Sequence, residues 1–265
     1  MKKTIRRIAP ASLVLVALTT LSFMAKDGIT LRLRPQQGKT YTINTKSNMM
    51  TMMEVQGQSM SMNQSIENRQ TFTAKEVTDK QSTIDTQIQS MKMNISQMGM
   101  TLTYDSEHPE KTSPMLAEQV QELEKELKKT VTLTYDNMGH LVGDTADITM
   151  NQLGGAVIEL PEKELKVGET WTANKSQSVN GSDFSVDMSY TVTAINKKSV
   201  DLSYTGTVSS NANNISGSYN GTASINPATG LMTKNTQKQN ISMTISEQGL
   251  SIPTTIVGTT TITVE

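Results

Sequence analysis

Apolar and polar residues alternate with a period of two along most of the chain. Successive side chains on a β-strand point to opposite faces, so this alternation predicts strands with one face inward and one in water. The clearest examples are residues 29–33, 84–88, 91–95, 100–104, 131–135 and 262–264. Thr, Ser, Asn and Gln occupy most of the polar positions. We therefore predict a mainly β protein, built of antiparallel strands in curved sheets or half-barrels.

One segment, residues 113–129, has the period of a helix. Its apolar residues are spaced by four, three and four positions, and they are Leu116, Val120, Leu123 and Leu127. Such spacing places all four on one stripe of an α-helix. Ser113 suits the N-cap and Pro114 suits the first helical position. We predict an amphipathic helix that lies on a sheet face, with a fixed cover favoured over a movable lid.

The order of short motifs in the first half of the chain is repeated in the second half. Residues 38–41 (Gly-Lys-Thr-Tyr) resemble 168–171 (Gly-Glu-Thr-Trp), and 72–80 resemble 190–198. Each half then reaches a tight turn that contains glycine, Gly139 or Gly230. We predict two similar β units, 26–160 and 161–265, packed into one body, with the helix inserted in the first. Chance similarity between Thr-rich strands is the alternative.

The first 25 residues are typical of an export signal. Lys2, Lys3, Arg6 and Arg7 precede an uncharged, mostly apolar stretch from 8 to 24. Cleavage after Ala25 is expected, with cleavage after Ser22 or an uncleaved anchor as alternatives. The sequence contains no cysteine for lipid attachment or disulfides. These features predict a soluble periplasmic, or secreted, protein without a membrane span after signal removal.

Removal of the signal also changes the charge balance. Four of the 24 basic residues and none of the 25 acidic ones are lost, so the mature chain carries a formal charge of 20 minus 25, or −5. That balance disfavours nucleic acid as a partner.

Residues that could carry chemistry are few. His108 and His140 have no metal-ligand spacing, and each is interpreted as a solvated loop histidine. Asp144 and Asp147 share a short loop but lack the rest of a calcium-binding pattern. No phosphate-binding loop or serine-nucleophile motif occurs. We therefore expect a non-enzymatic protein without a cofactor.

Methionine is concentrated in one region, because ten of the 18 methionines lie between positions 49 and 100. They could fill an ordinary core, line an adaptable apolar pocket, or form a soft-metal site for Cu(I). The pocket hypothesis combines two pairs of methionines with the helical stripe. Its candidate ligand-binding residues are Met60, Met62, Met91, Met93, Leu116, Val120, Leu123 and Leu127.

Several motifs together resemble a known family. Leu31, Leu33, Gly38 and Tyr41 form one of them, and the segments 104–106 and 160–171 form the others. In this combination the chain resembles a family of exported bacterial proteins of unknown function, which implies no activity and no site residues. More distantly, a curved sheet with a covering helix is similar to periplasmic lipoprotein-carrier folds, which hold acyl chains on a concave face.

These observations lead to an expected role in the cell envelope. The first hypothesis is an exported binding protein that holds a lipid-like or other apolar ligand on its methionine-rich sheet face. The alternative is a structural or interaction protein with a filled core and an envelope protein as partner. Copper binding is the third.

Overall fold

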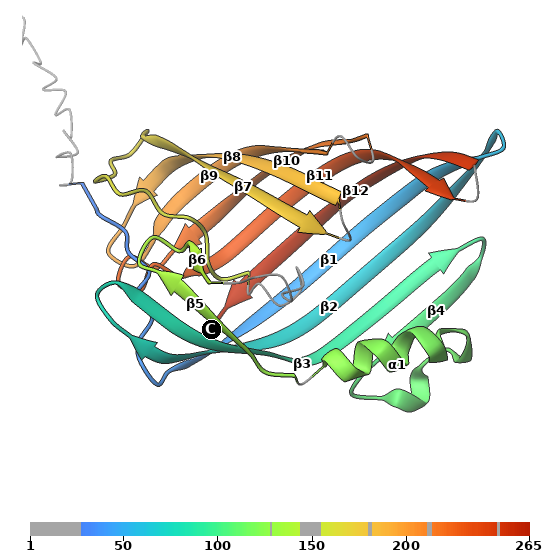
Figure 1. Cartoon of the computed structure of the whole chain (residues 1–265), viewed down its shortest axis with the longest axis horizontal. Coiled ribbons are helices and arrows are strands. Elements are labelled where there is room, and N and C mark those ends of the chain that lie inside the picture. Colours follow the sequence, from blue (N-terminus) through green and yellow to red (C-terminus); the bar gives the residue numbers. More distant parts are fainter. Residues whose placement is uncertain (1–27, 128, 144–154, 180–181, 211–213, 248–249) are drawn as a thin grey trace, which may run out of the picture.

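The computed structural model describes residues 28–265 apart from 128, 144–154, 180–181, 211–213 and 248–249, and these form a mainly β structure (Figure 1). The strands are β1 (Thr40–Val55), β2 (Gln58–Val77), β3 (Gln81–Gln97), β4 (Met100–Asp105), β5 (Val131–Asp136), β6 (Leu141–Val142), β7 (Thr170–Val179), β8 (Ser182–Ile195), β9 (Val200–Ser210), β10 (Ile215–Ile225), β11 (Met232–Glu247) and β12 (Leu250–Val264). The helical segments are η1 (Pro109–Lys111), η2 (Pro114–Leu116) and α1 (Ala117–Glu126).

All twelve strands belong to one antiparallel sheet, in the order β6-β5-β3-β2-β1-β12-β11-β10-β9-β8-β7, with β4 paired to β3. Within the described ranges the first and last strands of this order do not pair, so the sheet is open. It curls into a trough, with β1, β2 and β12 at its back and β7 at the upper edge in Figure 1. The β character is confirmed, but two separate units are not evident, because β1 pairs with β12 along eleven residue pairs.

Two hairpins at one end of the trough have local causes in the sequence. Gln56 and Gly57 join β1 to β2 with φ angles of 52° and 78°, and Met98 and Gly99 join β3 to β4 with 50° and 78°. Two successive residues at positive φ are required by the tight hairpin turn whose twist matches that of its strands. The end of β11 and the start of β12, which pair with each other, lie at the same end, which we call the open end.

The opposite end of the trough is closed by a packed core. Leu31, Leu33, Leu160 and Leu165 are buried there against inward side chains of the sheet, including Phe72. The prediction of a strand over residues 29–33 was wrong. Only Ile29 forms a bridge, with Leu165, whereas the backbone N–H of Leu33 donates to the carbonyl of Asn137 at 2.8 Å. The alternation in this segment reflects burial of every second residue under the sheet, not pairing within it.

The two motifs that resemble each other in sequence have the same backbone hydrogen bonds. The N–H of Gly38 donates to Ala74 at 2.7 Å, and that of Gly168 donates to Val192 at 2.8 Å. Both glycines have positive φ, and the register of the following hairpin shifts next to Ala74 and next to Val192. The duplication itself, with its boundary near Leu160, remains a prediction.

The predicted helix is present but shorter than expected. Pro114 begins the 3₁₀ turn η2, and the α-helix proper ends at Glu126, with Leu127 as its C-cap. Ser113 does not cap the helix with its side chain. Its hydroxyl accepts the backbone N–H of Thr103 at 2.9 Å, which ties the start of the helical segment to β4. Within the described ranges, no helix combines the length and the apolar character needed to cross a bilayer.

Candidate functional site

The two faces of the long strands differ in character. Tyr41 and Ile43 on β1 are buried in the core, which defines the inner face of the trough. Lys46 and Asn48, at the alternate positions, are exposed on the outer face. Beyond Ile43, β1 continues for twelve more residues to Val55, well past the closed core. The inner face near the open end is therefore a separate surface.

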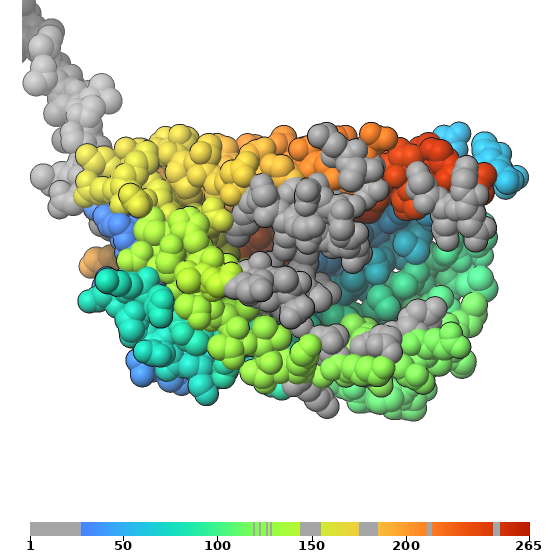
Figure 2. Space-filling model, in the orientation of Figure 1, coloured from blue at the N-terminus to red at the C-terminus, as the bar shows by residue number. Residues whose placement is uncertain are grey.

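Apolar side chains dominate that part of the inner face, which we call the apolar zone. Its residues are Met53, Met60, Met62, Ile241, Met243, Ile245, Ile252 and Ile256. The strand register places them together, since Met53 pairs with Met60 and Ile241 with Ile256. Each is half-buried except Ile245, which is exposed, and none packs against either buried cluster of the described residues. Figure 2 shows this side hollowed between the red C-terminal strands and the green helical region.

A row of polar side chains crosses the inner face between the closed core and the apolar zone. This amide belt consists of Ser47, Gln64, Asn68, Gln237, Gln239 and Thr260. The hydroxyls of Ser47 and Thr260 hydrogen-bond each other at 2.8 Å. The hydroxyl of Tyr204 lies beside the belt, donating to Asn235 at 2.6 Å. All six belt residues are half-buried, so they line accessible space.

The eight residues predicted to bind a ligand divide into two groups. Met91 and Met93 lie under α1 in one cluster with the helical stripe, which consists of Leu116, Val120, Leu123 and Leu127. Tyr104, fully buried on β4, completes the packing in this cluster. Met60 and Met62 lie on the same inner face, but in the apolar zone. The described packing therefore makes α1 a cover over β3 and β4.

Sequence reasoning missed most of the apolar zone and all of the amide belt. The isoleucines and Met243 come from β11 and β12, in the half of the chain that is poor in methionine. Their alternation in residues 241–245 is visible in the sequence and was a usable signal. In addition, the methionines of β1 do not all share a face. Met53 lies on the inner face, whereas Met50 and Met52 are exposed on the outer face.

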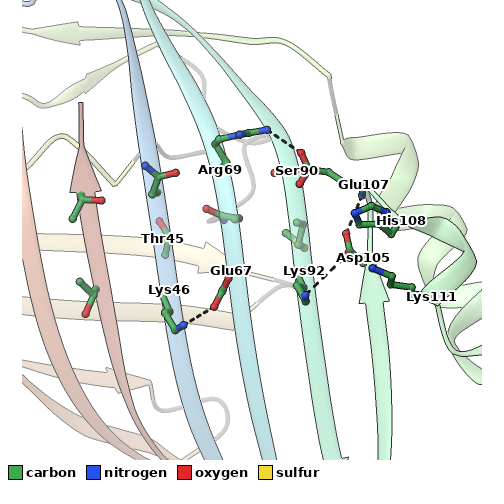
Figure 3. A pocket seen from close by; sticks show the side chains of 15 residues that line it. Thr45, Lys46, Glu67, Arg69, Ser90, Lys92, Asp105, Glu107, His108 and Lys111 are labelled. Carbon is green, nitrogen blue, oxygen red and sulfur yellow. Dashed lines mark hydrogen bonds and ion pairs between the residues drawn. The ribbon is translucent and has the colours of Figure 1, made fainter.

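The outer face carries a shallow groove lined by charged residues (Figure 3). Lys46 and Glu67 form an ion pair at 2.6 Å, and Lys92 lies 3.8 Å from Asp105. These four residues face one another across β1, β2, β3 and β4. In the same groove Arg69 pairs with Glu107 at 2.9 Å. Because these charges are paired with each other, the groove is explained as a cross-strand ladder on a solvated face.

Neither histidine belongs to a metal site in the described part of the chain, where no group of three His, Asp or Glu side chains could hold an ion. The Nδ1 atom of His140 lies 2.9 Å from Asp136. Burial alone raises the pKa of Asp136, but hydrogen bonds from His140 and from the N–H of Met138 outweigh it and lower the pKa. Asp144 and Asp147, the calcium candidates, lie outside the described residues.

The sequence comparison identifies a family for part of the chain. Residues 145–232, about a third of the 265, match the model of a family of unknown function (DUF6263). The expected resemblance to an uncharacterised family is thereby confirmed for this segment. No curated protein sequence matches the chain.

Three solved structures are distantly similar. One, described by its lipid–protein interactions, is lipovitellin, at 13% identity over 87% of this chain and a TM-score of 0.37; the chain spans only 25% of that protein. Another is an outer membrane channel from Pseudomonas putida F1, at 7% identity, covering 87% of this chain and 97% of the channel, with a TM-score of 0.34. The third is a putative outer membrane lipoprotein-sorting protein domain from Vibrio parahaemolyticus, at 11% identity, 84% and 83% coverage and a TM-score of 0.16. TM-scores this low do not establish a shared fold or ligand.

Proposed function

We propose that the protein is an exported, non-enzymatic binding protein of the cell envelope that holds a lipid-like ligand in its trough. The apolar zone carries this proposal. Sheets normally cover an apolar face with a second layer, and here the described residues supply that layer only at the closed core and under α1. The methionines of the zone are flexible and polarisable, which suits ligands of variable shape.

The absence of charged residues from the inward positions of the central strands supports the same ligand class. The inward positions of β1, β2, β3, β10 and β12, and those of β11 from Asn235 to Ile245, contain no Asp, Glu, Lys or Arg. Burial of hydrocarbon on such a surface gains about 0.8 kcal/mol per CH₂ group. A chain that buries ten such groups would gain roughly 8 kcal/mol, from which the costs of association are subtracted.

The location of this function rests on the N-terminal sequence. The basic and apolar segments before Lys26 are typical of an export signal. A periplasmic site of action would place the trough between two membranes, where apolar molecules need a carrier to cross water.

Native mass spectrometry of the mature protein, purified from a bacterial periplasm, tests the proposal. We expect adducts whose mass matches lipids recovered by solvent extraction. Met62→Glu, which puts a charge into the apolar zone, should abolish them, because burying an ionised carboxylate without a partner is costly. Asn63→Glu is the matched control, since the adjacent side chain is exposed on the outer face of the same strand.

The opposite outcome favours a structural or interaction protein. A homogeneous ligand-free mass, together with a stably co-purifying envelope protein, would contradict lipid binding. Adducts that persist in Met62→Glu would place the ligand elsewhere than in the trough.

A further inference from the structure

The amide belt indicates how a ligand lies in the trough. Resting on the proposed function, we propose that the trough binds an amphiphile head first, with an uncharged hydroxyl- or amide-bearing group on the amide belt. Its hydrocarbon tail then runs along the apolar zone towards the open end. The arrangement selects neutral amphiphiles over ionised ones of the same chain length.

The first observation is that the belt amides have poor partners. Among the described residues, the side-chain N–H groups of Gln64 and Gln239 donate only to sulfur, that of Met93 at 3.5 Å and that of Met49 at 3.6 Å. A thioether is a weak acceptor. The Oδ1 atom of Asn68 is buried and has no hydrogen-bond partner in the described structure. The amide groups of Gln64 and Gln239 are therefore available to a ligand, whereas the acceptor of Asn68 is buried and unsatisfied within the described structure.

The second observation is the kind of group that the belt offers. Primary amides both donate and accept, and so does a hydroxyl or amide on a ligand. An ionised head would need a charged partner, because burial of an unpaired charge is far more costly than burial of a hydrogen-bonded neutral group. The inward positions beside Gln64 and Gln239, on the same strands and on β1 and β12, include no basic residue. The belt therefore suits a neutral head.

The third observation is the length of the apolar zone. From Ile241 to Ile245, β11 advances four residues, which is roughly 14 Å at the rise of an antiparallel strand. One lipid leaflet contributes about half of the roughly 30 Å hydrocarbon thickness of a bilayer, so one acyl chain spans about 15 Å. A head on Gln239 places such a tail over the zone. Leu250, exposed at an inward position where β12 begins, extends the apolar surface towards the open end.

The test compares three ligands that share an oleoyl chain, bound to the mature protein at pH 8 and followed by displacement of a fluorescent fatty probe. They are monooleoylglycerol, with hydroxyls; methyl oleate, without a donor; and oleate, with an ionised head. We expect monooleoylglycerol to bind about tenfold more tightly than methyl oleate, from one to two net hydrogen bonds. Oleate should bind more weakly than either.

A variant on each face of β11 shows whether the belt causes this order. Gln239→Met should reduce the preference for monooleoylglycerol about fivefold, the value of one hydrogen bond, with binding of methyl oleate unchanged. Asn240→Met, whose side chain is exposed on the outer face, should leave both affinities unchanged.

The outcomes separate this inference from the proposed function. If none of the three ligands binds, the proposed function fails. Head-first binding is overturned, with lipid binding intact, if the ligands bind equally, if oleate binds most tightly, or if Gln239→Met keeps the full preference. Unchanged binding of methyl oleate shows that the variant trough is folded.

Discussion

Gly230 gives a sharp test of how the closed end is assembled. This glycine has a φ of 68°, in the turn between β10 and β11, and the extended segment around Arg32 crosses directly beneath it. A Cβ at Gly230 would overlap the carbonyl oxygen of Arg32 and lie 2.6 Å from the carbonyl carbon. Gly168 is the matched control, since its φ is 89° but a Cβ there would have no neighbour within 4 Å. Alanine at either position has the same kind of backbone strain, and only Gly230→Ala adds a collision.

The expected magnitudes follow from those contacts. Positive φ costs alanine about 1 kcal/mol, which sets the loss for Gly168→Ala. Relief of the collision in Gly230→Ala must displace the segment whose Arg34 N–H donates to Thr229 at 2.8 Å. Loss of that bond adds about 1 kcal/mol, and disturbed packing of the fully buried Leu33 adds about 1 kcal/mol more. We expect a total near 3 kcal/mol.

Urea unfolding followed by circular dichroism measures both losses. In a parallel thermal unfolding experiment, the difference of about 2 kcal/mol between the variants corresponds to roughly 4–8 °C in the midpoint temperature of a chain this size. If Gly230→Ala is no less stable than Gly168→Ala, the segment does not pack under this turn in solution, and the account of the closed end is wrong.

Two further predictions concern tyrosines. Tyr204→Phe should lower the free energy of unfolding by about 1 kcal/mol, because Asn235 loses its donor. Tyr104→Phe should be neutral or slightly stabilising, because the buried hydroxyl of Tyr104 has no partner in the described structure. Thermal unfolding of both variants measures these effects, and equal losses would contradict the hydrogen-bond assignment. Burial raises the pKa of Tyr135 and of Tyr204 from 10 to about 12. Since the folded state holds these protons more tightly, the free energy of unfolding should be fully present below pH 10 and fall as the pH rises towards 12, as urea midpoints at pH 9 and 11.5 would show. Tyr135→Phe should make the free energy of unfolding depend less steeply on pH, and an unchanged slope would contradict the role of Tyr135.

Several local features were predictable because their causes are local. Neighbours within a few positions determine the turn at Gly38, the hairpin turn at Met98 and Gly99, and the apolar stripe of α1. The length of α1 was overestimated, because helix ends depend on partners that lie on another element, such as the backbone N–H of Thr103 on β4, which donates to the Ser113 hydroxyl.

The candidate site was only partly predictable. The period of two places Met60 and Met62 on one face, as expected. The apolar stripe of α1 packs against Met91 and Met93. The isoleucines of β12 and the amide belt were missed, because their relevance depends on β1 pairing with the far end of the chain, where Ile43 faces Val264. No local period contains that information.

By itself, the sequence determined that the chain forms strands, which side chains share a strand face, and where one helix lies. It did so because the period of two and the spacing of the helical stripe are properties of consecutive residues. Only the tertiary structure decided that both halves join one open sheet, that Leu31 and Leu33 close one end, and that methionines of one half meet isoleucines of the other. Those outcomes depend on long-range pairing and on the curl of the sheet, which arise from contacts between segments more than two hundred residues apart.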